Sequence, residues 1–272
     1  MLPLTQWPLV ARRNIIGVFT DIDDTLTTDG AITPDALQAL ADLKAAGLHV
    51  IAITGRPVGW SEQVAFGGGK TWPVDAVVAE NGSTAIFANN KGFSLPQNRH
   101  ESLLKIYQQD GATRSKNYAR MQQVAARVLR EVPGAVLSQD SGGRETDIAI
   151  DHGEFMQLSA VKIKQVAQIM RSEGMNATVS SIHVNGWFGD HNKLAGARWI
   201  VRELFGRELD AEMDRWVYVG DSTNDALMFE HFVHSVGVAN IRRFEAELPH
   251  KPRYITQAER GAGFAEVARS LR

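Results

Sequence analysis

The hydrophobic positions at the start of this chain form short apolar runs separated by stretches of helical spacing. Apolar runs at 15–19, 49–53 and 74–79 have the length of buried strands. Between the first two, alanine and leucine recur at helical spacing, after the start signal Thr33-Pro34 and before Gly47. Strand, helix, strand, helix and strand in this order predict βαβ units and a parallel sheet.

The pattern changes in the middle of the chain and then returns. The middle part is expected to contain a hairpin at 83–95, helices at about 98–110, 117–131 and 155–172, and strands at 135–138, 145–150 and 177–184. Paired strands with helices between them are typical of an α+β unit. The βαβ pattern resumes with helices at 192–205, 226–232 and 263–271, and with strands at 215–219, 235–238 and 254–255.

This change of pattern predicts two domains. We expect an α/β core with a doubly wound, Rossmann-like parallel sheet, made of residues 1–83 and 188–272. An inserted α+β domain is expected at 84–187. Residues 1–14 precede the first strand and are expected to form a loose leader.

Acidic residues gather directly after the first strand, as Asp21, Asp23 and Asp24. Three carboxylates in four residues repel one another, and a divalent cation relieves that repulsion. Oxygen ligands of this kind suit Mg²⁺. An acidic turn that caps a helix is the alternative, and this stretch alone does not decide between the two.

Polar residues also stand at other strand ends and at the start of a helix, as Thr54, Lys193, Asp221 and Asp225. The carboxyl ends of parallel strands share one edge of a sheet, so these side chains can converge with the first acidic group. The set suggests phosphoryl transfer, in which one carboxylate attacks phosphorus and a second exchanges protons. A hydroxyl and an ammonium would hold phosphoryl oxygens, and the distant acid would complete a Mg²⁺ shell.

The order of these motifs resembles the haloacid dehalogenase superfamily. The motifs are Asp21-Ile22-Asp23-Asp24-Thr25, Ile53-Thr54-Gly55-Arg56, Lys193 and Gly220-Asp221-Ser222-Thr223-Asn224-Asp225. The insertion between the second and third motifs, preceded by Glu80-Asn81-Gly82, is similar to the cap of the Cof-like IIB subgroup. That subgroup includes sucrose-phosphate, trehalose-phosphate and mannosyl-phosphoglycerate phosphatases.

The resemblance implies the following roles in the chemical step. Asp21 would be the nucleophile that becomes an aspartyl-phosphate, and Asp23 would be the general acid and base. Thr54, Gly55 and Lys193 would bind the phosphate.

The resemblance also implies a metal shell. Asp21, Asp221 and the backbone carbonyl of Asp23 would bind Mg²⁺. Asn224 and Asp225 would support that shell from the same loop, and Asp225 would alternatively hold the lysine. Leucine follows Lys193 where the family motif usually has glycine.

Polar residues of the inserted domain are candidates for contact with the rest of the substrate. They stand on or beside predicted strands and are Arg144, Glu145, Asp147, His183 and Asn185. Arg56, after the second motif, is a further candidate for contact with the substrate or the cap, and Arg114 and Lys116 come next. The alternative is that these groups form the solvated face of a half-exposed sheet.

Composition narrows the function classes. The formal net charge is −2, so no broad basic field invites nucleic acid. The absence of cysteine excludes disulfides and cysteine nucleophiles. The N-terminus lacks the pattern of a signal peptide, and no apolar segment is long enough to span a bilayer, so a cytoplasmic protein without a membrane partner is expected.

Two other patterns favour ordinary explanations. Residues 67–71 are glycine-rich, but Val64 stands where a phosphate-binding loop needs glycine, so a turn is predicted. His191, His231 and His234 lie near the fourth motif in the sequence without an evident further zinc ligand, which favours surface or packing roles.

The sequence therefore predicts a Mg²⁺-dependent phosphatase of small phosphorylated metabolites, in particular sugar phosphates. A phosphosugar mutase of the same superfamily would use the same acids but return the phosphoryl group to the sugar. A receiver-like phospho-acceptor module is the non-enzymatic alternative. The sequence does not decide the individual substrate or the oligomeric state.

Overall fold

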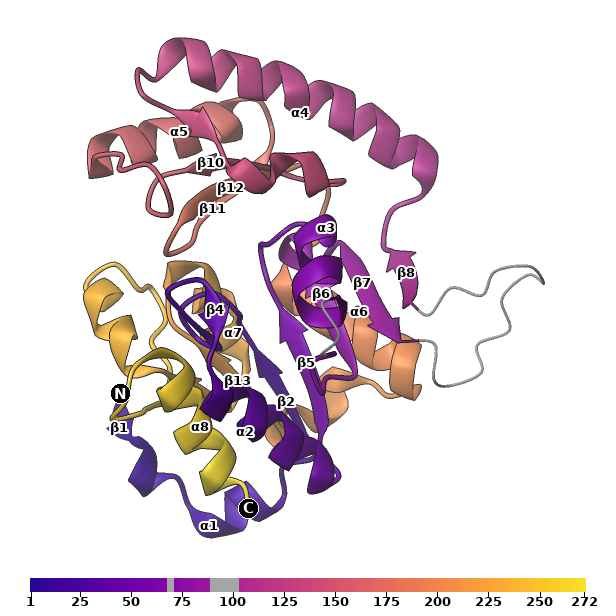
Figure 1. Cartoon of the computed structure of the whole chain (residues 1–272), viewed down its shortest axis with the longest axis vertical. Coiled ribbons are helices and arrows are strands. Elements are labelled where there is room, and N and C mark those ends of the chain that lie inside the picture. Colours follow the sequence, from indigo (N-terminus) through magenta and orange to yellow (C-terminus); the bar gives the residue numbers. More distant parts are fainter. Residues whose placement is uncertain (68–70, 89–102) are drawn as a thin grey trace, which may run out of the picture.

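The computed structural model describes residues 1–67, 71–88 and 103–272. Within these residues a nine-stranded sheet forms the larger part of the molecule (Figure 1). Its strands, in spatial order, are β1 (Leu2–Pro3), β15 (Tyr254–Ile255), β14 (His234–Gly237), β13 (Trp216–Gly220), β2 (Gly17–Thr20), β5 (His49–Ile53), β6 (Ala76–Ala79), β7 (Thr84–Ala88) and β8 (Leu103–Tyr107). Neighbours from β1 to β6 pair in parallel, and β7 and β8 are antiparallel additions.

Helices cover both faces of this sheet (Figure 1). One face packs against α2 (Pro34–Ala45) and α8 (Arg260–Ser270), and the other against α6 (Lys193–Phe205) and α7 (Ala226–His231). Side chains alternate along the strands, so Val18 joins the first of these hydrophobic cores and Phe19 the second. Shorter elements are α1 (Leu9–Arg13), α3 (Val58–Ser61) and a ribbon of β3 (Thr27–Thr28) and β4 (Ala31–Ile32).

A second unit lies beyond the carboxyl ends of the parallel strands (Figure 1). Its four-stranded antiparallel sheet has the order β11 (Asn176–Val179), β12 (His183–Trp187), β10 (Ile148–Asp151) and β9 (Val136–Leu137). The helices α4 (Gly111–Glu131) and α5 (Ala160–Ser172) cover its outer face and bury a separate hydrophobic core. The other face of the sheet is turned toward the larger unit (Figure 1).

The predicted fold class, a Rossmann-like α/β core with an inserted α+β unit, is confirmed, with local corrections. The helix predicted at about 98–110 is wrong where the structure describes it, because Leu103–Tyr107 is the strand β8 and pairs with β7. The far arm of the hairpin predicted at 83–95 lies outside the described residues. The strand predicted at 177–184 is two strands, because Ser180 Oγ accepts the backbone N–H of His183 at 3.0 Å in a turn between them.

The N-terminal residues also differ from expectation. Residues 1–14 are not a loose leader, because β1 pairs with β15 at the sheet edge. Trp7 is fully buried and stacks on Tyr254. Among the described residues, no helix combines the length and the apolar character needed to cross a membrane.

Candidate active site

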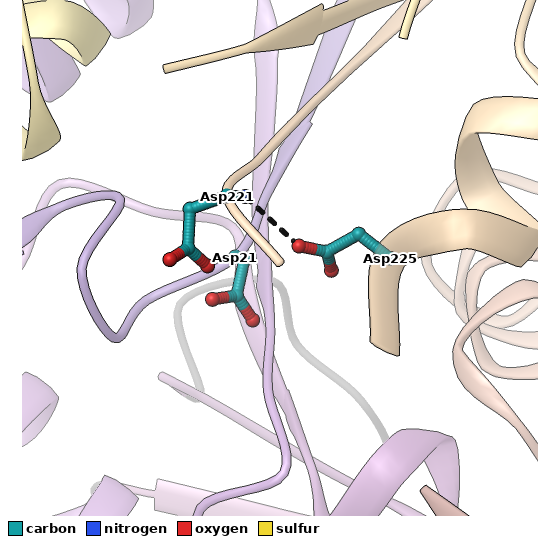
Figure 2. A group of neighbouring side chains, drawn as sticks. All are labelled: Asp21, Asp221 and Asp225. Carbon is teal, nitrogen blue, oxygen red and sulfur yellow. Dashed lines mark hydrogen bonds between the residues drawn. The ribbon is translucent and has the colours of Figure 1, made fainter. Parts of the chain in front are cut away.

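Three neighbouring parallel strands end in the predicted site residues. Asp21 follows β2, Asp221 follows β13 and Thr54 follows β5. The backbone N–H of Asp21 donates to Val219 O at 2.9 Å, which continues the β2–β13 pairing and places the two acids side by side. Figure 2 shows the carboxylates of Asp21, Asp221 and Asp225 gathered at this edge.

Lys193 joins this group from the first turn of α6. Asn192 caps the helix by accepting the N–H of Ala195 at 2.9 Å. The buried Lys193 Nζ donates to Asp21 Oδ1 at 2.6 Å and to Asp225 Oδ1 at 2.7 Å. Burial lowers the pKa of Lys193, but the carboxylates of Asp21 and Asp225 outweigh it, so the net pKa is raised and the lysine stays charged.

Two glycines let α6 approach closely enough to deliver this lysine. Gly82 has φ +107°, and a Cβ there would lie 2.2 Å from Asn192 O. A Cβ at Gly196 would lie 2.6 Å from the Cα of Gly82. Leucine stands after the lysine, where the resembling motif usually has glycine. Gly196, three residues after the lysine, makes the close backbone contact with Gly82.

Asp225 is fully occupied by contacts within the protein. Its Oδ1 accepts from Lys193 Nζ and from Tyr218 Oη, and its Oδ2 accepts the backbone N–H groups of Asp221 and Ser222 at 2.9 and 3.1 Å. These contacts fix the Asp221 loop and the lysine together. Asp225 therefore suits a supporting role better than that of a metal ligand.

Asp221 is the acid of this group whose side chain can still bind a ligand. Its Oδ2 accepts from Asn240 Nδ2 at 3.1 Å, whereas its buried Oδ1 has no partner among the described residues. Burial, together with the nearby Asp21 and Asp225 carboxylates, raises the pKa of Asp221 well above its ordinary value. Ligand oxygens of Asp21, Asp221 and Asp225 lie within 4.8 Å of one another. An unpartnered buried carboxylate oxygen in an all-oxygen cluster fits a hard divalent cation such as Mg²⁺.

Asp23 lies beside Asp21 but has a different partner. Its Oδ1 accepts from Arg56 Nη2 at 2.8 Å and both its oxygens lie 3.0 Å from Arg56 Nε. The same guanidinium donates to two acids of the second unit, to Asp140 Oδ2 at 3.2 Å and to Glu154 Oε1 at 2.7 Å. Arg56 therefore links the predicted general acid to the inserted unit.

Two further predicted cap residues contact the loop of the second motif. Arg144 Nη1 and Asn185 Nδ2 both donate to Gly55 O, at 3.0 and 3.2 Å. Both also donate to Asp147, at 2.7 and 2.9 Å. Burial raises the pKa of Asp147 to about 7, although Arg144 opposes the shift. These residues hold the inserted unit against the core.

Glu80 makes a third connection, from a strained turn. Glu80 and Asn81 both have positive φ, at 47° and 56°, which is rare for residues other than glycine. The buried Glu80 carboxylate accepts the backbone N–H of Glu145 at 2.9 Å and of Thr146 at 2.5 Å. The Glu145 side chain itself points elsewhere and accepts from Tyr107 Oη at 2.7 Å, so it does not join the other predicted cap residues.

His183 lies over the site from β12. Its Nε2 is 3.0 Å from Glu154 Oε2. With the two units in contact, a cavity of only about 10 Å³ remains among Asp21, Asp23, Thr54, His183 and their neighbours. A cavity of this size holds about one water molecule, so it has no room for a substrate in this arrangement.

Several residues of this network had no signal in the sequence. Tyr218 and Asn240, which contact Asp225 and Asp221, lie in β13 and in the short 3-10 helix Ala239–Phe244, and neither belongs to a motif. Asp140 and Glu154 reach Arg56 across a long sequence separation. Glu80 could have been found, because an acid at the end of a buried strand is the same signal that singled out Asp21.

The Arg56 contacts give a first testable prediction. In Arg56→Ala, Glu154 loses its arginine partner and Asp140 keeps only Arg144, so the contact between the two units weakens. The backbone amides of Glu145 and Thr146, which donate to the core, should then exchange with solvent at least about tenfold faster. Hydrogen exchange followed by mass spectrometry measures this directly.

The matched control is Arg243→Ala. Arg243 pairs at the surface with Glu259 at 2.9 Å, and neither residue belongs to the inserted unit. Its loss should leave exchange at both amides unchanged. Unchanged exchange in Arg56→Ala as well would mean that this arginine does not hold the two units together.

Comparisons with known proteins agree with this geometry. Residues 18–124 match the family of haloacid dehalogenase-like hydrolases. No curated protein matches the chain. Sucrose-phosphatase from Synechocystis, solved with sucrose and phosphate, is 16% identical, with a TM-score of 0.62 over 95% of this chain and 98% of that one.

Two other solved structures have the same fold. The C-terminal domain of trehalose-6-phosphate phosphatase from C. albicans is 12% identical, with a TM-score of 0.65 over 100% of this chain and 98% of that one. A sugar phosphatase of HAD subclass IIB is 16% identical, with a TM-score of 0.57 over 93% and 96%. The family match over residues 18–124 and the fold shared with these solved structures confirm the resemblance to the haloacid dehalogenase-like hydrolases.

Proposed function

We propose that this protein is a Mg²⁺-dependent phosphatase that hydrolyses small phosphorylated metabolites, in particular sugar phosphates. The observation that carries the proposal is the buried contact of Lys193 with Asp21, beside the unpartnered oxygen of Asp221. Phosphatases of sucrose phosphate and trehalose 6-phosphate have the same fold, which supports the substrate class.

In the proposed reaction Asp21 attacks phosphorus and becomes the aspartyl-phosphate. Asp23 donates a proton to the leaving oxygen and then takes one from the water that hydrolyses the intermediate. Lys193, the Thr54 hydroxyl and the backbone at Gly55 hold the phosphoryl oxygens. Arg56, bound to Asp23, keeps that carboxylate aimed at the leaving group when the two units are in contact.

The proposed reaction uses one Mg²⁺ site. Asp21, Asp221 and the backbone of Asp23 would hold Mg²⁺, supported by Asn224 and Asp225 through the loop after β13. A bound Mg²⁺ supplies positive charge that offsets the repulsion between the nucleophile and the phosphate. Burial raises the pKa of Asp21 to about 7 although Lys193 opposes it, so a further cation beside Asp21 favours the ionised form that attacks.

We also propose that the inserted unit at 84–187 selects the substrate. Because β7 and β8 pair into the large sheet, the part that moves would begin after Tyr107. His183 and the side-chain oxygen of Asn185 would contact the leaving group, since both residues line the small cavity beside Asp21 and Asn185 Nδ2 is engaged by Gly55 and Asp147. Arg144 would act through Gly55 and Asp147, because its donors are already engaged there.

The test is a screen for phosphate release. Purified protein with Mg²⁺ should hydrolyse p-nitrophenyl phosphate and release phosphate from at least one member of a panel of hexose and disaccharide phosphates. Product analysis by NMR separates the phosphatase from a mutase, because the mutase returns an isomeric sugar phosphate and no free phosphate. Absence of both products would contradict the proposal.

A further inference from the structure

The hydroxyl of Tyr218 reaches the candidate active site from inside the hydrophobic core. Tyr218 lies in β13 and is fully buried, and its ring packs against Phe229 and Phe232 with centroids 5.7 and 5.8 Å apart. Its Oη donates to Asp225 Oδ1. A buried tyrosine hydroxyl usually has a hydrogen-bond partner, so this contact alone would suit a purely structural role.

The same hydroxyl also faces the lysine of the site. Lys193 Nζ donates to Tyr218 Oη at 3.4 Å, in addition to Asp21 Oδ1 at 2.6 Å and Asp225 Oδ1 at 2.7 Å. An ammonium group has three N–H donors, so these three oxygens account for all of them. The tyrosine therefore takes part in fixing the direction of the donor that reaches Asp21.

Tyr218 also fills the last acceptor position of Asp225. The backbone N–H groups of Asp221 and Ser222 occupy Oδ2, and Lys193 and Tyr218 share Oδ1. A carboxylate offers about four acceptor positions, so this one is saturated. Without the hydroxyl, Oδ1 would keep a lone pair that attracts the buried ammonium away from the nucleophile. Burial and the nearby carboxylates raise the pKa of Tyr218 well above its ordinary value, so the hydroxyl keeps its proton and remains a donor.

The packing around Gly220 keeps the tyrosine and the aspartate together. A Cβ at Gly220 would lie 2.4 Å from Asp225 Oδ2 and 3.0 Å from Tyr218 Cε1, so glycine leaves the room that both side chains need. Phenylalanine at position 218 would occupy the same space, because it differs from tyrosine by the hydroxyl alone. The hydrogen bonds of Tyr218 can therefore be removed while the packing stays.

We propose that Tyr218 is a positioning residue for phosphoryl transfer, because its hydroxyl saturates Asp225 and so directs the Lys193 ammonium toward Asp21 and the phosphoryl oxygens. The inference rests on the proposed phosphatase function. Lys193 offsets the charge of the nucleophile and of the phosphate only while it points at both, and a lysine drawn toward Asp225 would do so less. Tyr218 acts through Asp225 and Lys193 and would not contact the substrate itself.

The experiment uses Tyr218→Phe in the full chain with Mg²⁺. We expect kcat/KM to fall, and the inhibition constant of inorganic phosphate to rise, by at least about tenfold each. The loss should be equal for p-nitrophenyl phosphate and for the sugar phosphates, because Lys193 acts on the phosphoryl group that all these esters share. The melting temperature should change little, since Asp225 keeps its lysine and both backbone donors.

The matched control is Tyr254→Phe. Tyr254 is a buried tyrosine of β15 in the same sheet, and its ring stacks on Trp7. This variant should keep both constants of the wild type. If Tyr218 were purely structural, Tyr218→Phe would also keep both constants and lower only the melting temperature, and that result would overturn the proposal. Unequal losses on aryl and sugar esters would overturn it too, because they would place the effect at the alcohol part of the substrate.

Crystal structures of both proteins test the position of the lysine directly. In Tyr218→Phe the distance from Lys193 Nζ to Asp21 Oδ1 should exceed about 3.2 Å, the usual limit for an N–H···O bond, and an unchanged lysine would overturn the proposal. If the wild type releases no phosphate from any ester, the phosphatase proposal fails. Titration calorimetry with inorganic phosphate and Mg²⁺ then still decides the role of Tyr218. Weaker phosphate binding by Tyr218→Phe supports that role, and equal binding, or no binding by the wild type, overturns it.

Discussion

Replacing Asp21 by asparagine should abolish phosphate release, with kcat lowered at least about a thousandfold. The amide keeps the size of the side chain but removes the attacking oxygen, and a covalent mechanism has no substitute for it. The fold should survive, because Lys193 keeps its contact with Asp225. Rates with p-nitrophenyl phosphate and the melting temperature measure the two effects separately.

A covalent adduct tests the same residue without relying on rates. Acid-quenched wild-type protein should carry one phosphoryl group on the peptide that contains Asp21, and the asparagine variant should carry none. Asp29→Asn is the matched control, since Asp29 has an exposed side chain near the same loop and should keep full activity. More than about a hundredth of the wild-type rate in Asp21→Asn would place the nucleophile elsewhere.

The second large effect concerns Asp221. Without metal, Asp221→Asn should stabilise the protein by about 1–3 kcal/mol, because it removes a buried charge that has an unpartnered oxygen beside two other acids. The wild type should instead gain about 2.7 kcal/mol from Mg²⁺ at a hundred times its Kd, and the variant should gain little. Thermal unfolding of both proteins in EDTA and across a Mg²⁺ titration measures which protein is more stable without the metal and which is more stable with it.

Activity should follow the same pattern. EDTA should stop phosphate release by the wild type and Mg²⁺ should restore it, whereas Asp221→Asn should stay slow at every Mg²⁺ concentration. Asp210→Asn, at an exposed side chain, controls for the loss of one negative charge. A wild type that works in EDTA and does not respond to Mg²⁺ in thermal unfolding would remove the metal from the mechanism.

The residues that the sequence could place are those whose position follows from the sheet. Asp21, Thr54 and Asp221 each follow an apolar run, and parallel strands bring such positions to one edge whatever the details of packing. The alternation of strands and helices could be predicted from the same apolar runs. The roles of these residues stay predictions until the experiments above are done, although the structure places them together.

The residues that the sequence could not place depend on contacts between distant segments. Leu103–Tyr107 is a strand because it pairs with β7, although its local pattern predicts a helix. The sequence does not decide whether Arg56 contacts the substrate or the cap, because its acidic partners Asp140 and Glu154 lie far along the chain. The Glu145 carboxylate lies away from the other candidates because it accepts from Tyr107 of β8, while its backbone N–H donates to Glu80.

The β2–β13 pairing has a consequence for the folding of the chain. These neighbours at the centre of the sheet are distant in sequence, and the whole inserted unit lies in the loop that they close. Closing so long a loop costs entropy before any contact repays it, so this pairing should form late in folding. During synthesis, a nascent chain that ends before β13 carries Asp21 on an unpaired strand edge, and the cluster of acids is assembled only after the insert has left the ribosome.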